Sequence, residues 1–253
     1  MTSLFQNAPS PNRQAIRLFC VPHAGVGPSA FRGWKEQLKP EVEVIVIQLP
    51  GRESRFREEP YQRIEGLAND LTEAIRPYLA DNQRFAFFGN SLGGLISFET
   101  LHEIERRTAR RAAHLFVSAT GAPHLPPPLA PIGDLGDREL VREISERYGG
   151  IPSQVMQDEE FLAVVVPTLR ADIRMLEAYE RTAPNPLSCP ITAFGGSRDQ
   201  TVPMEHIAGW SEQTTDSFTR VILDEEHLFL QSAREELTTN VRETLLGANH
   251  GVD

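Results

Sequence analysis

Short apolar runs alternate along the chain with amphipathic segments. Six runs predict strands: Ile16–Val21, Val42–Leu49, Phe85–Phe88, Leu115–Ser118, Ile191–Phe194 and Phe218–Leu223. Runs that are continuously apolar are typical of strands buried on both faces of a parallel sheet. Between them, Phe31–Leu38, Ile64–Leu79 and Leu92–Ile104 carry apolar residues three and four positions apart, as helices that cover a sheet do. The pattern predicts an α/β fold with a mostly parallel, doubly wound sheet.

The alternation stops between Gly121 and about Ala183, where we predict no strand. This segment opens with a proline-rich stretch at 123–131 and continues with two predicted helices, Asp137–Arg147 and Glu159–Tyr179. Proline prevents helix formation, so the stretch marks a departure from the sheet. One interpretation is a long crossover connection. The interpretation we favour is a helical lid insertion at about 121–183 that roofs a substrate chamber.

The length and composition are typical of one globular α/β domain spanning residues 1–253. The chain has 253 residues, of which 40% are hydrophobic and 24% charged. Its formal net charge of −10 argues against a nucleic-acid partner, because binding phosphates needs a basic surface. Cys20 and Cys189 lie in or beside apolar runs and are expected in the core. With no predicted signal peptide or membrane-spanning run, we expect a cytoplasmic protein.

Gly89-Asn90-Ser91-Leu92-Gly93 matches the Gly-x-Ser-x-Gly nucleophile elbow. The pentapeptide alone is a weak signal in a chain of this length. A predicted strand ends just before it and a predicted helix begins just after it, which is the setting that this elbow requires. Ser91 would then lie at a helix N-terminus, where free N–H groups favour a developing negative charge. The alternative is an ordinary serine N-cap in a glycine-rich turn.

A nucleophilic serine needs a base, and in folds with this elbow the order along the chain is Ser, then Asp or Glu, then His. Five histidines fit this role poorly. His23 precedes Ser91, and His102 lies on the predicted helix that follows it. His114 and His124 precede any later acid loop, and His250 lies in a polar tail. Of the remaining two, His206 lies in a helical stretch, whereas His227 follows a predicted strand in a loop. Asp199 also lies in a loop between a predicted strand and a helix. We predict Ser91, Asp199 and His227 as a catalytic triad.

The oxyanion that forms during acyl transfer needs two hydrogen-bond donors. The backbone N–H of Leu92, directly after the nucleophile, is the first candidate. The glycine-containing loop Pro22–Gly27 follows the first predicted strand, and its Ala24 N–H is the second candidate. The alternative interpretation of this loop is a simple connecting turn.

Several segments together resemble one enzyme family. They are Pro22-His23-Ala24-Gly25, Gln48-Leu49-Pro50-Gly51-Arg52-Glu53, the elbow at Gly89–Gly93, Phe98-Glu99, and the loops of Asp199 and His227. The chain resembles the type II thioesterases that accompany polyketide and non-ribosomal peptide synthetases. The resemblance implies an α/β-hydrolase fold and release of stalled acyl groups from the phosphopantetheine arm of an acyl or peptidyl carrier protein. It implies no cofactor. We also expect no metal and no membrane partner, and we expect a monomer.

The chain departs from the family pattern at two places. Asn90 stands where a histidine commonly precedes the nucleophile, and Asp224-Glu225-Glu226 precedes His227 where two glycines are usual. A basic segment with Arg52, Arg55 and Arg57 could meet an acidic carrier protein or could be a solvated loop. Two further enzyme functions use the same triad: a small-molecule carboxylesterase or lipase, and an acyl-CoA thioesterase. A non-catalytic binding protein on a hydrolase scaffold is the third alternative.

Overall fold

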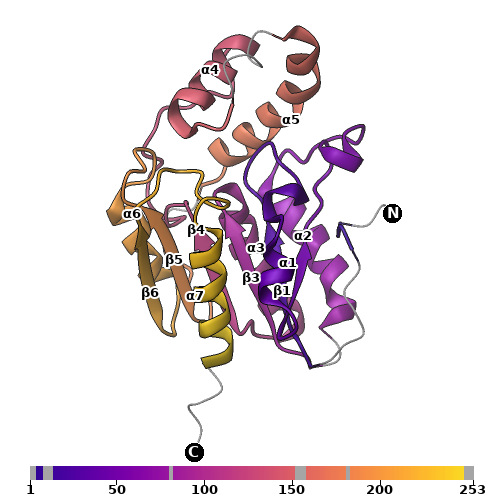
Figure 1. The fold of residues 1–253 in the computed structure, drawn as a ribbon, viewed down its shortest axis with the longest axis vertical. Coiled ribbons are helices and arrows are strands. Elements are labelled where there is room, and N and C mark those ends of the chain that lie inside the picture. The colour runs from indigo at the N-terminus through magenta and orange to yellow at the C-terminus, as the bar shows by residue number, and fades with distance from the viewer. Residues whose placement is uncertain (1–3, 8–13, 80–81, 152–157, 181–182, 248–253) are drawn as a thin grey trace, which may run out of the picture.

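Each of the six runs predicted as strands lies in one fully parallel sheet (Figure 1). The strands are β1 (Ile16–Val21), β2 (Val42–Val46), β3 (Phe85–Asn90), β4 (His114–Ser118), β5 (Ile191–Gly196) and β6 (Phe218–Leu223). Their order is β2-β1-β3-β4-β5-β6, and every neighbouring pair is parallel. The predicted α/β fold class is therefore confirmed.

The computed structural model describes residues 4–7, 14–79, 82–151, 158–180 and 183–247. His250, most of the polar N-terminal stretch, and residues 152–157 and 181–182 of the predicted lid lie outside the described residues. No helix among the described residues is long and apolar enough to cross a membrane.

Four strand ends differ from the prediction. β4 begins one residue earlier, at His114, and β5 continues to Gly196. The other two differences have identifiable physical reasons. β2 ends at Val46, and Ile47 instead forms an antiparallel bridge to Phe5, so the apolar run continues beyond its parallel pairing. β3 extends to Asn90, which pairs with Ser118 of β4. Glycine and asparagine disfavour strands in isolation, but here the ladder on a neighbouring strand holds them. This extension carries the chain directly into the elbow at Ser91.

Helices cover both faces of the sheet (Figure 1). On one face, α1 (Trp34–Leu38) and α7 (Arg234–Gly247) contact each other and share a core with Phe88 and Phe116. On the other face lie α2 (Ile64–Ile75), α3 (Leu92–Thr108) and the short α6 (Met204–Ala208). The sheet is thus doubly wound, as predicted.

Three predicted helices are shorter in the structure. The helix predicted at Glu159–Tyr179 ends two residues early, at Glu177. Gly33, with a φ of 86°, separates a 3₁₀ turn at Pro28–Phe31 from α1, so no single helix spans Phe31–Leu38. α2 ends at Ile75 because Pro77 has no N–H for the next helical hydrogen bond, and a 3₁₀ turn at Arg76–Tyr78 follows.

The segment predicted as a lid contributes α4 (Asp137–Tyr148) and α5 (Glu159–Glu177). These two helices lie together at one end of the molecule, beyond the carboxyl edge of the sheet (Figure 1). They form a hydrophobic cluster of their own, in which Leu140 and Ile144 of α4 meet Leu162 and Val166 of α5. Amphipathic helices need such a partner face to be stable, and here each supplies it to the other.

Candidate active site

Ser91 lies in a sharp turn between β3 and α3. Its φ of 51° and ψ of −119° are a strained backbone conformation for a residue with a side chain. The Ser91 N–H donates to the carbonyl of Ser118 at 2.7 Å, and the Ser91 carbonyl accepts from Gly94 N–H at 2.8 Å. These two bonds hold the turn, which has the geometry of a nucleophile elbow.

The glycines of the elbow are required by close backbone packing. A Cβ on Gly89 would overlap the carbonyl of Gly93, and a Cβ on Gly93 would overlap the carbonyl of Val21 in β1. A Cβ on Gly94 would come within 2.5 Å of the Thr120 side chain. Helix α3 therefore packs against the sheet more closely than side chains permit, and this places its first turn over the strand ends.

His227 connects Ser91 to Asp199, so the three residues predicted as a triad lie together. Its Nε2 lies 3.3 Å from Ser91 Oγ, and its Nδ1 lies 2.8 Å from Asp199 Oδ2. The three residues come from the carboxyl ends of β3, β5 and β6, which lie at the same edge of a parallel sheet. His227 is buried, and its ring centroid lies 4.9 Å from that of Tyr148 in α4.

Thr201 is a partner of this group that sequence reasoning missed. Its Oγ donates to Asp199 Oδ1 at 2.6 Å, and its N–H donates to the same oxygen at 2.7 Å. Burial works to raise the pKa of Asp199, but the hydrogen bonds from His227 and Thr201 together hold that pKa below its ordinary value. Asp199 is thus a carboxylate at neutral pH, able to accept the Nδ1–H of His227.

The two candidate oxyanion donors come from α3 and from the loop after β1. Leu92 is the first residue of α3, so its N–H has no partner within the helix. Ala24 lies in the loop that follows β1 and lines the same cavity as Ser91. The neighbouring Gly25 has a φ of 79°, which allows the loop to turn beside the catalytic serine.

Two cavities meet at Ser91 and His227. The first, which we call the apolar chamber, has a volume of about 300 Å³ and lies against the loop of Ala24. The helices α4 and α5 give it an apolar wall of Val141, Ile144, Phe161, Leu162, Val165 and Leu169. Such a wall suits the hydrocarbon part of a substrate.

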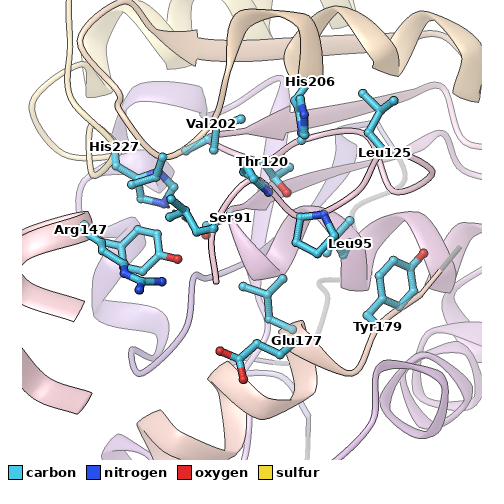
Figure 2. A pocket seen from close by; sticks show the side chains of 18 of the residues that line it. Ser91, Leu95, Thr120, Leu125, Arg147, Glu177, Tyr179, Val202, His206 and His227 are labelled. Atoms are coloured by element: carbon cyan, nitrogen blue, oxygen red, sulfur yellow. Dashed lines mark hydrogen bonds between the residues drawn. The ribbon is translucent and has the colours of Figure 1, made fainter. Parts of the chain in front are cut away.

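The second cavity, the proline-side chamber, has a volume of about 160 Å³. Figure 2 shows Ser91 and His227 at one side of it and Glu177 and Tyr179 at another. His206, the rejected candidate base, also borders this chamber from α6. The proline-rich stretch forms part of its wall and is held at its end by α4 and α5. Arg147 donates to the Ala130 carbonyl, and Glu177 accepts from the N–H of Ile132, the residue after the stretch.

Comparison with known proteins decides the family. The family model described as "Thioesterase domain" matches residues 16–245. The chain belongs to the thioesterase family. This thioesterase is 37% identical over 233 residues to the gramicidin S biosynthesis protein GrsT of Aneurinibacillus migulanus, covering 92% of this chain and 90% of the relative.

Solved structures agree with this assignment. The RedJ thioesterase of the prodiginine biosynthetic pathway in Streptomyces coelicolor superposes with a TM-score of 0.83 at 36% identity, covering 94% of this chain and 96% of that one. The type II thioesterase BorB of the borrelidin biosynthetic cluster gives 0.83 at 28% identity, with 96% of each chain covered. The protein is therefore a thioester hydrolase with the α/β-hydrolase fold, which confirms the predicted family and enzyme class.

Asn90, the first departure from the family pattern, joins two buried elements in this thioesterase. Its Oδ1 accepts from Ser118 Oγ at 2.9 Å, and its Nδ2 donates to His23 Nδ1 at 3.0 Å. Burial, reinforced by the nearby His227, lowers the pKa of His23 to about 4. The His23 ring that borders the apolar chamber is therefore neutral at physiological pH.

The acidic run before His227 turns its side chains outward. Asp224 pairs with Arg198 at 3.2 Å, and Glu225 accepts from Ser232 Oγ at 3.0 Å. The close approach in this loop is made possible by a glycine on the opposite strand, because a Cβ on Gly196 would overlap the carbonyl of Glu225. The loop thus reaches His227 without the two glycines that the family pattern usually has.

The three arginines of the basic segment have different environments. Arg52 is buried and pairs with Asp172 of α5 through two hydrogen bonds, of 2.6 and 3.0 Å. Arg55 is mostly buried and pairs with Glu58. Arg57 is exposed and lies over the ring of Phe56. Of the three, only Arg57 is placed to meet an anionic partner.

Proposed function

We propose that the protein hydrolyses acyl thioesters carried on the phosphopantetheine arm of an acyl or peptidyl carrier protein, and so frees carriers that hold stalled acyl groups. The observation that carries the proposal is the hydrogen-bonded series Ser91, His227, Asp199, in which Ser91 and His227 line an apolar chamber. The named relatives from natural-product biosynthesis support the carrier-bound substrate. We also propose that the protein is a cytoplasmic monomer that serves a polyketide or non-ribosomal peptide synthetase.

In the first half of the proposed cycle, His227 Nε2 takes the proton of Ser91 Oγ as that oxygen attacks the thioester carbonyl carbon. The carbonyl oxygen becomes an oxyanion held by the N–H groups of Leu92 and Ala24. The carbon–sulfur bond then breaks, and the imidazolium of His227 gives its proton to the departing thiolate. Asp199 stabilises that imidazolium throughout.

In the second half, His227 takes a proton from water, and the hydroxide attacks the acyl carbonyl. The bond from Ser91 Oγ to the acyl carbon breaks, and the proton returns to Ser91. All proton transfers use side chains of this protein, so the proposal includes no cofactor and no metal. Among the described residues, no cluster of three His, Cys, Asp or Glu side chains could hold a metal ion.

The test is the release of acetyl and longer acyl groups from a phosphopantetheinylated carrier protein. Wild type and Ser91→Ala are compared on the carrier, on matched acyl-CoA and on p-nitrophenyl esters. We expect release that depends on Ser91 and is faster from the carrier than from CoA. Activity limited to simple esters would instead indicate a carboxylesterase, and equal rates on CoA and carrier would indicate an acyl-CoA thioesterase.

A further inference from the structure

A carboxylate of helix α5 bonds directly to the loop that carries one of the oxyanion donors. Asp172 is fully buried, and its Oδ2 accepts from the backbone N–H of Gly25 at 2.8 Å. Gly25 follows Ala24, whose N–H is the second oxyanion donor in the proposed mechanism. From this contact we infer that Asp172 is a positioning residue that holds the Ala24 donor in place. The inference rests on the proposed function only through the role given to Ala24.

Asp172 is itself held in one orientation. Both of its oxygens accept from the Arg52 guanidinium, and Arg52 Nε donates to the Pro50 carbonyl at 3.0 Å. A buried charge pair is tolerated when its hydrogen bonds are satisfied, and here both Arg52 and Asp172 have further hydrogen-bond partners besides each other. The carboxylate therefore presents a fixed acceptor to Gly25, and the loop cannot turn that N–H elsewhere without leaving a buried acceptor short of a donor.

Helix α5 meets the same loop through a second contact. The side chain of Leu169, nearly one turn before Asp172, lies 2.8 Å from the position that a Cβ on Gly25 would occupy. Gly25 is thus fixed by a hydrogen bond on its N–H and by packing on its Cα. Gly25 has a left-handed φ of 79°, which is accessible mainly to glycine and makes the turn between Ala24 and Val26. The contact with Leu169 lies at this turn.

α5 is divided by Pro167, which removes one helical hydrogen bond. The part before it, including Phe161 and Val165, lines the apolar chamber. The part after it bonds to the loops beside the sheet, through Thr168 Oγ to the Gly51 carbonyl at 2.5 Å and through Asp172. The part after Pro167 also contributes Leu169 to the chamber wall, so this part of α5 contacts both the acyl chamber and the loop of Ala24.

The experiment compares Asp172→Asn with Thr168→Val, the matched control. Thr168→Val removes another buried bond of α5 to a loop but leaves Gly25 untouched. Kinetics on a short acyl-CoA are combined with binding of two inhibitors of equal chain length. One is a trifluoromethyl ketone, which forms an oxyanion adduct on Ser91, and the other is the corresponding unreactive alcohol.

In Asp172→Asn one acceptor oxygen replaces two, and the Arg52 guanidinium competes with the Gly25 N–H for it. We expect kcat to fall 10- to 100-fold with KM nearly unchanged, because the Ala24 donor is then misaligned and not removed. Affinity for the trifluoromethyl ketone should fall by a similar factor, while affinity for the alcohol stays. Thr168→Val should resemble wild type. Unchanged ketone affinity in Asp172→Asn, or equal losses in both variants, would overturn the inference.

A second variant covers the case in which Asp172→Asn does not fold. Arg52→Met with Asp172→Leu replaces the buried charge pair by apolar side chains, a change that proteins often tolerate. This double variant lacks the acceptor for Gly25 and should show the same loss of kcat in a folded protein; full activity would overturn the inference. Failure of the proposed function would be recognised separately, because Ser91→Ala would then retain the activity of wild type.

Discussion

Asn90 and His23 share a hydrogen bond that fixes which nitrogen of the histidine ring carries the proton. The Asn90 amide oxygen is occupied by Ser118 Oγ, so its Nδ2 faces His23 Nδ1, which must accept. The proton of neutral His23 is therefore on Nε2. No described residue accepts a hydrogen bond from that nitrogen, and the ring borders the apolar chamber.

Asn90→Asp should make the activity more sensitive to acid. A carboxylate can only accept at this position, so His23 Nδ1 would carry a proton and the ring would become charged near neutral pH. A positive charge there opposes formation of the His227 imidazolium during catalysis. We expect kcat relative to wild type to be about tenfold lower at pH 6 than at pH 8. Superimposable pH–rate profiles for the two proteins would contradict this account.

The stability of the fold should depend on two histidines, the partly buried His23 and the buried His114. Burial lowers the pKa of both His23 and His114 to about 4 from the ordinary value of 6.5. Between pH 6.5 and about 4 the unfolded chain binds protons that the folded protein does not. The free energy of unfolding is therefore not reduced by these histidines above pH 6.5. It falls as the pH falls through this window, by up to about 1.4 kcal/mol per pH unit for each histidine.

His114→Gln tests this dependence away from the active site. His114 bonds to Thr192 Oγ at 2.8 Å and stacks on Phe116, so glutamine retains a polar partner while removing the titrating ring. Urea unfolding at pH 7, 6 and 5 should show a shallower loss of stability in the variant, by up to about 1.4 kcal/mol per pH unit. A slope equal to that of wild type would mean that folded His114 takes up the proton.

Two glycine substitutions should have opposite effects on stability. Gly93→Ala would force a Cβ into the Val21 carbonyl in the elbow, and we expect a loss of more than about 3 kcal/mol or failure to fold. Gly66→Ala, in the exposed face of α2 with open space around it, should add about 0.5–1 kcal/mol. Thermal and urea unfolding measure both. A mild effect of Gly93→Ala would show that α3 can move away from β1 at a small cost in free energy.

Asp199→Asn and Thr201→Val separate the orienting carboxylate from its support. An asparagine amide facing Nδ1 would leave the proton of His227 on Nε2, where it blocks acceptance of the Ser91 proton, so kcat should fall about 10⁴-fold. Thr201→Val removes one of several bonds to Asp199 and should cost no more than about tenfold. Steady-state kinetics on one acyl-CoA compare them. Similar losses in the two variants would assign the orienting role to Thr201 as much as to Asp199.

The parts of this protein that could be predicted from sequence are those with a local signature. A buried strand shows itself as an apolar run, and the elbow shows itself as two glycines around Ser91 between a strand and a helix. Asp199 and His227 followed because parallel strands bring their carboxyl ends to one edge.

The contacts that could not be predicted join distant segments. Arg52 and Asp172 are 120 positions apart, and neither position has a local pattern that points to the other. The sequence therefore groups Arg52 with its neighbours as a candidate surface residue, whereas the structure buries it. Thr201 lies two residues from Asp199, but only the folded loop shows its hydroxyl against both the acid and the base.

The length of the acyl group that the enzyme accepts should be set by the side of α5 that faces the apolar chamber. Val165 lines that chamber, whereas its neighbour Val164 is 60% exposed. Val165→Trp adds a large ring to a chamber of about 300 Å³ and should lower kcat/KM for long acyl thioesters at least tenfold while sparing acetyl. Val164→Trp is the matched control and should leave the chain-length profile unchanged. A parallel decline on all chain lengths in Val165→Trp would instead mean that the substitution disturbs Ser91, and equal profiles for both variants would place the acyl group in the proline-side chamber.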